Sequence, residues 1–350
     1  MAKQIRRILV AVGDVRHVPK NELGKAAALA RSSGASLELF HAIMEADPGR
    51  SYPETATARV VAQQRIRAAA RQEQRLHQMA RGPAFRGLKV SCTASWDFPP
   101  HEAIIRRAHA TKADLVVAAS RHHRFGARLF LTNHDWELIR QCPVPVLLVK
   151  SRRPYKNLVV MAAVDPFHAH ARPADLDTRL IDTGTRIAKL LRGSLHIFHA
   201  YMPLLSVEPM PGAPPVMLPP DAEKAHSEVI TRTVEDLAAT TGVPTRRCHV
   251  HMGGVSAELA AAVQRIGAQL VVMGAVSRSA LARLFIGSAA ERVLDRLTCD
   301  VLVVKPRGFK PKISSRRAVT VTDLTVERRK VPASQRISRT SEFTAPPALL

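Results

Sequence analysis

An internal repeat is the feature of this chain that most constrains its fold. Residues 34–42 read GASLELFHA, and residues 192–200 read RGSLHIFHA. Residues 92–117, CTASWDFPPHEAIIRRAHATKADLVV, resemble residues 248–272, CHVHMGGVSAELAAAVQRIGAQLVV. Residues 142–150, CPVPVLLVK, resemble residues 298–306, TCDVLVVKP. The paired blocks follow one another in the same order at an offset of about 155 residues. The chain therefore contains two copies of one domain.

Each copy alternates short apolar, β-rich runs with longer amphipathic stretches. Runs that are apolar almost throughout are typical of strands covered on both faces, so the alternation predicts a parallel sheet wound on both sides by helices. In the second copy we expect strands at residues 157–164, 194–201, 245–252, 269–274 and 300–304. We expect helices there at residues 173–191, 221–241, 256–266 and 287–296, with Ser256 and the pair Gly287-Ser288 marking two helix starts.

The repeat also sets the expected domain limits. The first domain takes residues 1–150 and the second takes residues 155–306, with a junction near SRRPYK. The tail, residues 307–350, has ten Lys and Arg against three acidic residues and is rich in Ser, Thr and Pro. Such a composition predicts a largely disordered segment. The predicted fold class is therefore α/β, with two tandem doubly wound parallel-sheet domains and a basic C-terminal tail.

The net positive charge of the chain limits the kinds of binding partner that we expect. A formal net charge of +23 favours anionic partners such as nucleotides, nucleic acid or acidic lipid headgroups. We expect nucleic acid to bind, if at all, only through the basic tail. The four cysteines lie far apart without metal-ligand spacing, so we expect reduced thiols. The sequence shows no signal-peptide pattern and no apolar run of about 18 residues, so we expect a soluble cytoplasmic protein without a membrane span.

A glycine-bounded loop separates the fourth expected strand of the second copy from the next helix. Gly274 ends that strand, and Gly287-Ser288 precede the helix. Open parallel sheets bind ligands past the carboxyl ends of their strands, and backbone N–H groups at a helix start favour anions. Glycine at a strand end and Gly-Ser before a helix are also ordinary chain punctuation. The loop is therefore either a phosphate cradle or a plain connection.

These motifs together resemble the universal stress protein family in its tandem, two-domain form. The resemblance rests on ILVAV in the first strand, FHA in the second, the run VVMG–x2–S–x9–GS, and the following AERVL and CDVLVVKP. It covers residues 4–306 and excludes the tail. It implies five parallel strands per domain in the order 3-2-1-4-5. It also implies that the second domain binds ATP or a related nucleotide.

By this resemblance, the nucleotide site combines strand ends with the glycine-bounded loop. Asp165 holds the position of an Asp that contacts adenine in nucleotide-binding members. Ser277 stands where those members have a second glycine, and its Cβ could crowd the ribose or a phosphate. The implied binding residues are Ala163, Val164, Asp165, Ala200, Met273, Gly274, Ser277, Gly287, Ser288 and Ala289.

The first copy departs from the glycine pattern. Ala119 replaces the first glycine, His122 takes the place of the second, and Thr132-Asn133 replace the Gly-Ser pair. The resemblance therefore implies a degenerate first domain that packs on the second as the other half of a family dimer, with further homodimerisation left open. The run SRHHRFGAR at residues 120–128 is either a solvated loop or a segment that attracts an anion.

Metal binding and catalysis find little support in the residue pattern. Several histidines occur in pairs, but no cysteine or carboxylate has convincing ligand spacing with them, so no metal ligand is assigned. The motifs GxSxG, HExxH and GxxxxGK[ST] are absent from the sequence. We therefore expect a protein that is not an enzyme, with a slow ATPase left open.

A proline-rich apolar loop suggests a second hypothesis about the function of the chain. Residues 202–220 hold seven prolines and follow the second strand of the second copy. This loop either lines a groove for a lipid-like or protein ligand or packs against the neighbouring domain. Besides nucleic-acid binding through the basic tail, two functions remain open at this point. One is an ATP-binding stress-response factor for survival of stress, including DNA damage, as the resemblance implies. The other is a binding or scaffold protein that uses no nucleotide.

Overall fold

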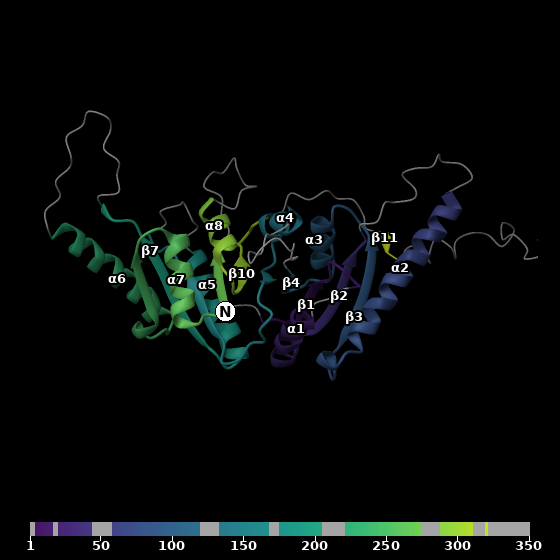
Figure 1. Ribbon diagram of the computed structural model, residues 1–350, viewed down its shortest axis with the longest axis horizontal. Helices are drawn as coiled ribbons and strands as arrows, with labels where there is room; N and C mark the ends of the chain where they lie inside the picture. Colours follow the sequence, from purple (N-terminus) through teal and green to yellow (C-terminus); the bar gives the residue numbers. More distant parts are fainter. Residues whose placement is uncertain are drawn as a thin grey trace, which may run out of the picture.

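The strands of both copies form one continuous sheet (Figure 1). The computed structural model describes residues 4–16, 20–43, 58–119, 133–167, 175–204, 221–274, 288–310 and 319–320. The first copy supplies β1 (Arg7–Ala11), β2 (Ser36–Ala42), β3 (Val90–Trp96), β4 (Leu115–Ala119) and β5 (Val146–Val149). The second copy supplies β6 (Val159–Ala163), β7 (Ser194–Tyr201), β8 (Cys248–Met252), β9 (Leu270–Gly274) and β10 (Asp300–Val304).

Helices cover both faces of this sheet. The first copy has α1 (Lys20–Ser33), α2 (Ala58–Ala80), α3 (Pro100–Ala110) and α4 (Asn133–Gln141). The second copy has α5 (Asp175–Leu190), α6 (Ala222–Thr240), α7 (Val255–Ile266) and α8 (Ser288–Arg296). One buried core joins α1, α2, α5 and α6 to the sheet, and the other joins α3, α4, α7 and α8 to its opposite face. Each core runs through both copies, so the two halves share their hydrophobic stabilisation.

The sheet order confirms the fold expected from the sequence. The full order is β11-β3-β2-β1-β4-β5-β10-β9-β6-β7-β8, which reads 3-2-1-4-5 within each copy. All strand pairs inside a copy are parallel. Two pairs are antiparallel: β5 with β10, where the copies meet, and β11 (Val319–Thr320) with β3.

Two element boundaries of the second copy were wrong in the sequence reading. The strand expected from residue 245 begins at Cys248, because residues Thr245–Arg247 form the short 3-10 helix η4 directly after Pro244. The helix α7 begins at Val255, and Ser256 lies inside it. Gly254 is the extended residue before the helix and offers no side-chain cap, so the helix start depends on backbone geometry and not on the Ser256 hydroxyl.

The repeated FHA motif has a structural role in both copies. The buried His199 ring places Nδ1 3.1 Å from the Val164 carbonyl oxygen. The buried His41 ring places Nδ1 2.7 Å from the Val12 carbonyl oxygen in the first copy. A carbonyl only accepts, so Nδ1 carries the proton in each ring. Each histidine thereby holds the carboxyl end of the first strand against the second strand.

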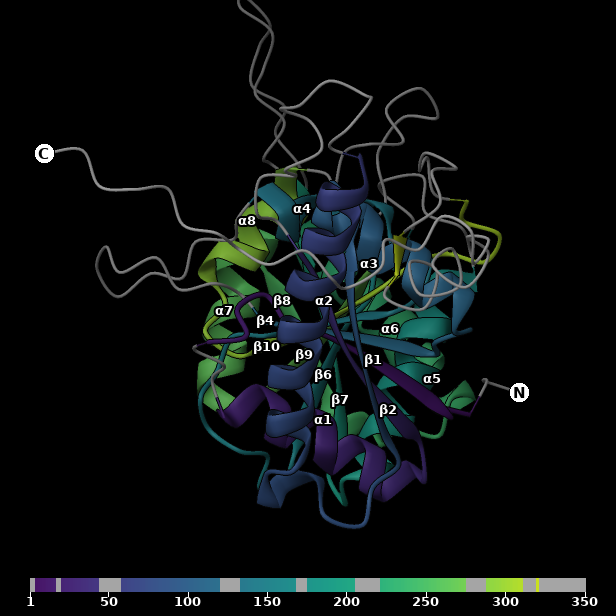
Figure 2. The same ribbon diagram turned by 90° about the vertical axis from the view of Figure 1, so that its right-hand side faces the viewer.

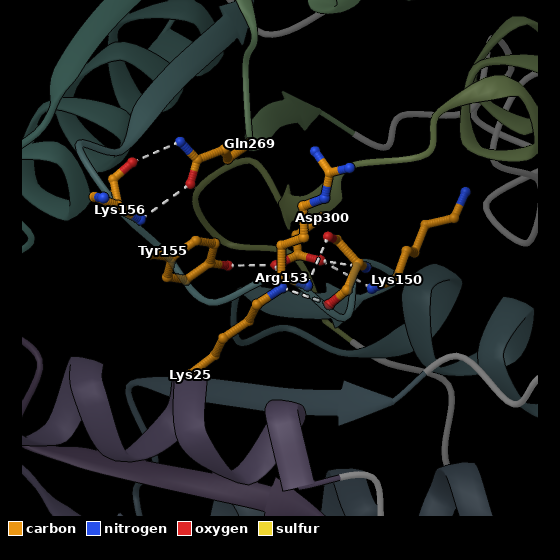
Figure 3. A network of polar contacts seen from close by, with 8 residues as sticks. Lys25, Lys150, Arg153, Tyr155, Lys156, Gln269 and Asp300 are labelled. Atoms are coloured by element: carbon orange, nitrogen blue, oxygen red, sulfur yellow. Dashed lines mark hydrogen bonds and ion pairs between the residues drawn. The ribbon is translucent and has the colours of Figure 1, made fainter.

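A buried carboxylate ties the two copies together (Figure 3). Asp300 of β10 is fully buried and accepts from Lys25 Nζ of α1 at 2.6 Å and from the Tyr155 hydroxyl at 2.7 Å. It also accepts from the backbone N–H groups of Lys150 and Ser151 at 2.9 and 2.8 Å. Close by, burial raises the pKa of Glu22 to about 8, so Glu22 carries a proton at neutral pH and adds no second negative charge.

The helices beside the β5–β10 pair add further contacts between the copies. Arg140 of α4 donates to Glu291 of α8 at 2.7 Å. The buried Lys150 ammonium donates to the carbonyl oxygens of Leu294 and Leu297 at the end of α8. A cation at a helix C-terminus is favoured because it faces unpaired carbonyl groups. These contacts fix the position of α8, whose first turn lies near the carboxyl edge of the sheet in the second copy.

The described part of the tail includes a short strand, β11. The sequence predicts no stable structure for residues 307–350, of which residues 307–310 and 319–320 are described. Val319 pairs with Trp96 and Thr320 pairs with Ser95, on the outer edge of β3. Among the described helices, none is long and apolar enough to cross a membrane.

We predict that Asp300→Ala destabilises the protein by about 3–5 kcal/mol, because the change leaves the Lys25 ammonium and three further donors buried without their acceptor. Asp300→Asn keeps the size and one acceptor, so its effect should be about half as large. Urea unfolding followed by circular dichroism measures both. The exposed Asp236→Ala serves as control and should change the stability by less than about 0.5 kcal/mol. Wild-type stability in Asp300→Ala would show that the carboxylate does not hold the copies together.

Candidate functional site

A cavity lies at the carboxyl ends of β6 and β7 in the second copy. Its volume is about 430 Å³. Open α/β sheets bind ligands at this edge, so the position is that of a ligand site. Strand ends form its floor, and α6, α7 and α8 contribute its walls. The lining residues are Ala163, Val164, Asp165, Phe167, Phe198, His199, Ala200, Tyr201, Met202, His226, Ile230, Gly253, Val255, Leu259, Met273, Ala290 and Val293.

Half of the residues named from the sequence lie on this cavity. Ala163 ends β6, and Val164 and Asp165 follow it directly. Ala200 lies near the end of the neighbouring strand β7, and Met273 lies near the end of β9. These five residues come from three strands that are adjacent in the sheet, which explains why residues far apart in the sequence meet there.

Asp165 is held in place through its backbone. Its N–H group donates to both carboxylate oxygens of Asp177, at 3.1 and 3.2 Å. Asp177 is buried in the first turn of α5, where a negative charge is favoured by the helix dipole. The carboxylate of Asp177 thus fixes the chain where it leaves β6. Sequence reasoning missed this residue, because its partner lies on the backbone of a loop and leaves no motif.

Gly274 lies at the end of β9 but does not line the cavity. A Cβ at this position would come within 2.8 Å of the Leu176 Cδ2 atom of α5. The glycine therefore permits close packing of helix on strand, whatever its relation to a phosphate. Among the other expected residues, Ser277 and Gly287 lie outside the described residues. Ser288 and Ala289 are the first residues of α8, and only their backbone is described.

Several lining residues were not found from the sequence. The Phe167 and His199 rings lie 5.8 Å apart, and the Tyr201 and His226 rings meet edge-on at 5.6 Å. Phe167 and Met202 are exposed although they are large and apolar. Phe198 could have been found from the period-two pattern of β7, which puts it on the same face as Ala200. The residues from α6, α7 and α8 carry no local signal, since their meeting depends on the tertiary packing.

The expectations that concern other loops lie outside the described residues. These are the anion-attracting reading of residues 120–128 and the ligand-groove reading of residues 205–220 in the proline-rich loop. Only Met202, Pro203 and Leu204 of that loop are described. The Leu204 N–H donates to Glu223 Oε2 at 3.0 Å, so the loop begins attached to α6.

A pair of histidines on β7 and β8 lies outside the lining of the cavity. His196 Nδ1 is 2.9 Å from His249 Nε2, and the two rings stack at 5.2 Å. Burial, followed by the nearby His249, lowers the pKa of His196 to about 4. Burial also lowers the pKa of His249, with His251 adding to the effect. His251 in turn lies 3.2 Å from Glu258 of α7. Within the described part of the chain, no three His, Cys, Asp or Glu side chains are grouped so that they could hold a metal ion.

This pair predicts a loss of stability in acid. In the unfolded chain a histidine titrates near 6.5, whereas His196 has a folded-state pKa of about 4. The unfolded state therefore binds the proton first, and stability falls as the pH drops from about 6.5 towards 4. Since the ring is only partly buried, we expect a loss of about 1 kcal/mol between pH 7 and pH 5 from this residue. Urea unfolding at both pH values measures it.

The variant His196→Gln should reduce this pH dependence, because it removes the group that binds the extra proton. His109→Gln, at an exposed position of α3, is the matched control and should keep the wild-type slope. Equal slopes in wild type and His196→Gln would contradict the assignment.

Comparison with known proteins gives a consistent family signal. The model of the universal stress protein family matches residues 4–150 and again residues 160–305. Universal stress protein E of Escherichia coli K12 is 28% identical over 250 residues, which cover 68% of this chain and 75% of that protein. Universal stress protein E of Photorhabdus laumondii is 26% identical over 235 residues, which cover 65% of this chain and 73% of that protein.

Solved structures share the fold. A putative universal stress protein from Pseudomonas aeruginosa matches with a TM-score of 0.66 at 23% identity, over 93% of this chain and 98% of that one. A universal stress protein from Archaeoglobus fulgidus matches with a TM-score of 0.59 at 16% identity, over 87% of this chain and 99% of that one. At such identities the likeness concerns the architecture alone.

Proposed function

Because the chain belongs to the universal stress protein family and carries two copies of its domain, we propose that it is a cytoplasmic stress-response factor whose second domain binds an adenine nucleotide. The observation that carries the proposal is the cavity at the carboxyl edge. It is lined by Ala163, Val164, Asp165 and Ala200, the positions at which the family resemblance places adenine. The role in survival of stress, including DNA damage, follows from the family resemblance.

The cavity suits a flat heterocycle with polar edges. Small and apolar side chains such as Ala163, Ala200 and Met273 offer contact to the faces of a base. Asp165 supplies an acceptor that an exocyclic amine can use. His199 donates through Nδ1 to the Val164 carbonyl, so its Nε2 is an acceptor in the neutral ring. A volume of about 430 Å³ leaves room for a base and part of a ribose.

The phosphates would lie towards the start of α8. That helix begins at Ser288, and its first turn borders the cavity through Ala290. Backbone N–H groups at a helix start favour phosphate. Ser277 and Gly287 would complete the cradle, as the family motif implies. We propose binding and signalling as the activity of this site, with no residue assigned to catalysis.

A second candidate is an apolar ligand in the same cavity. Besides Asp165, His199, Tyr201 and His226, the lining is apolar. Phe167, Met202 and Val255 are exposed apolar residues of the lining. Exposed apolar groups around a concave site favour a lipid-like chain or an apolar side chain of a partner. The proline-rich loop starts at Met202, so this reading gives it a role.

Two variants, Gly287→Val and Ala200→Leu, distinguish an adenine nucleotide from an apolar ligand. We predict that wild-type protein binds fluorescent ATP and that Gly287→Val lowers the affinity at least tenfold, because a branched side chain obstructs the approach of phosphate to the backbone. Gly126→Val, in the corresponding loop of the first copy, should leave ATP affinity unchanged. Fluorescence anisotropy measures all three proteins. An equal loss in both variants would contradict a phosphate cradle confined to the second copy.

We also predict that Ala200→Leu weakens any ligand of the cavity, since the added atoms occupy its volume. Binding of a fluorescent fatty acid that falls at least tenfold with Ala200→Leu and is unchanged with Gly287→Val would favour the apolar ligand. If the wild-type protein does not bind ATP even at millimolar concentrations, the adenine-nucleotide proposal fails.

A further inference from the structure

The outermost helix of the first copy carries an unusual charge. The helix α2 contains five arginines and one glutamate, Glu73. Its buried side, represented by Ala69, Gln72 and Leu76, packs over β3 and β2. Figure 2 shows α2 lying along the end of the molecule that faces the viewer. The opposite side of the helix therefore points away from the protein.

The exposed side of α2 continues as a basic surface. Arg67 and Arg71 are exposed one helical turn apart, and Arg75 is half-buried a further turn on. At 1.5 Å per residue these three form a row about 12 Å long. Further exposed cations follow where the chain leaves the helix. We call the set formed by Arg31, Arg67, Arg71, Arg75, Arg81, Arg86 and Lys89 the α2 basic face.

The parts of this face are contiguous. Arg31, at the end of α1, donates to the carbonyl oxygen of Ala84 at 2.9 Å, in the short 3-10 helix η2 (Pro83–Phe85) that follows α2. Arg86 comes directly after η2. The arginines of α1, α2 and the following turn therefore lie on one end of the molecule.

These cations lack acidic partners among the described residues. No ion pair of that part of the chain involves any member of the α2 basic face. Other arginines of the same copy behave differently. Arg106 pairs with Asp97 and Glu102, and Arg107 pairs with Glu38. Charges that remain unpaired and clustered create a positive potential, which an anionic partner can use.

The second copy provides an internal comparison. The helix α6 occupies the same position in its domain as α2, between the second and third strands, and lies at the opposite end of the molecule (Figure 1). It contains four acidic residues and two basic ones. Its exposed residues Glu228, Arg232 and Asp236 alternate in sign at four-residue spacing. A general excess of arginine in the chain would affect both helices, so the basic charge of α2 is a local property.

The surroundings indicate which anion fits. The exposed large apolar residues of the described chain are Phe98, Phe167, Met202, Val229, Met252 and Val255, and none lies on the α2 basic face. A helix that inserts into a membrane surface needs such residues beside its cations. Single-stranded nucleic acid is bound through aromatic stacking platforms, which this face also lacks. Among the described residues, these arginines have no exposed large apolar or aromatic neighbours, which suits the phosphates of a duplex, where contacts do not depend on sequence.

From these observations we propose that the α2 basic face binds the sugar–phosphate backbone of a nucleic-acid duplex, without reading its sequence. The interaction uses the first copy, whereas the nucleotide site proposed above belongs to the second. The described part of the tail is consistent with this assignment, because β11 pairs with β3 at the edge that α2 covers. The tail thereby returns to the basic end of the molecule.

The test uses the full chain and a fluorescent 30-base-pair DNA duplex of random sequence, with binding followed by anisotropy at several salt concentrations. Wild type should bind at low salt, and its affinity should fall steeply as salt rises. The variant Arg67→Glu/Arg71→Glu/Arg81→Glu should weaken binding at least tenfold and reduce the salt slope by about 3. A neutral variant with Gln at the same positions should lose less affinity while keeping the same melting temperature as wild type.

The matched control makes the same change in net charge at the other end of the molecule. Lys224→Glu/Arg232→Glu/Arg246→Glu alters exposed residues of α6 and η4. It should leave the affinity within about threefold of wild type, because the excess charge alone acts weakly at a distance. Equal losses in both triple variants would reduce the effect to net charge and overturn the proposal.

Two further outcomes would also overturn it. If Arg328→Ala/Arg329→Ala/Lys330→Ala alone abolishes DNA binding, the tail is the binding segment and the α2 basic face is not. If phosphatidylglycerol vesicles bind wild type and compete fully with the duplex, the partner is a membrane surface. Preserved ATP binding in the α2 variant keeps this result separate from the proposed function of the second domain.

Discussion

The structure depends on the antiparallel pairing of β5 with β10 and on the buried carboxylate beside it. Ladder hydrogen bonds join the two strands, with Leu302 opposite Leu147, and turn two five-stranded sheets into one. Asp300, at the start of β10, gathers donors from α1, from the junction and from the end of β5. Loss of any of these partners would leave the buried charge less well compensated, which disfavours other arrangements of the two copies. The shared cores, and the position of α8 beside the carboxyl edge of the sheet, follow from that arrangement.

Within each copy, a second constraint acts on the carboxyl edge of the sheet. The histidine of FHA holds the end of the first strand through its carbonyl, and Asp177 holds the next residue of the second copy through its N–H. Together they hold both polar groups of the peptide that joins Val164 to Asp165. The strand end that carries Ala163, Val164 and Asp165 into the cavity is therefore held by side chains from β7 and α5. The same local device occurs at Val12 in the first copy, where the binding motif has diverged.

Features that depend on residues close together in the sequence could be predicted, and features that depend on contacts between distant residues could not. Strands of the second copy begin and end within a few residues of their expected limits, because a strand buried on both faces needs an apolar run that is visible locally. The start of α7 was misplaced, since Gly254 ends the loop without a side-chain cap. Lys25 and Asp300 are 275 residues apart, so no local pattern could pair them. Likewise, the strand-end residues of the cavity could be named from a motif, whereas Tyr201, His226 and Val293 meet only through packing. The loop residues Ser277 and Gly287 remain predictions.

Fusing two copies into one chain has a consequence for symmetry. A dimer of identical subunits related by a two-fold axis must present the same groups at both of its ends, and any charge imbalance between the ends cancels. Here α2 and α6 occupy equivalent ends but have diverged, one being rich in arginine and the other mixed in sign. The two end helices therefore differ in charge, which the ends of a symmetric dimer cannot. A large anion would therefore be attracted to the α2 end, whereas α6, which contributes His226 and Ile230 to the cavity of the second copy, lies at the opposite end (Figure 1).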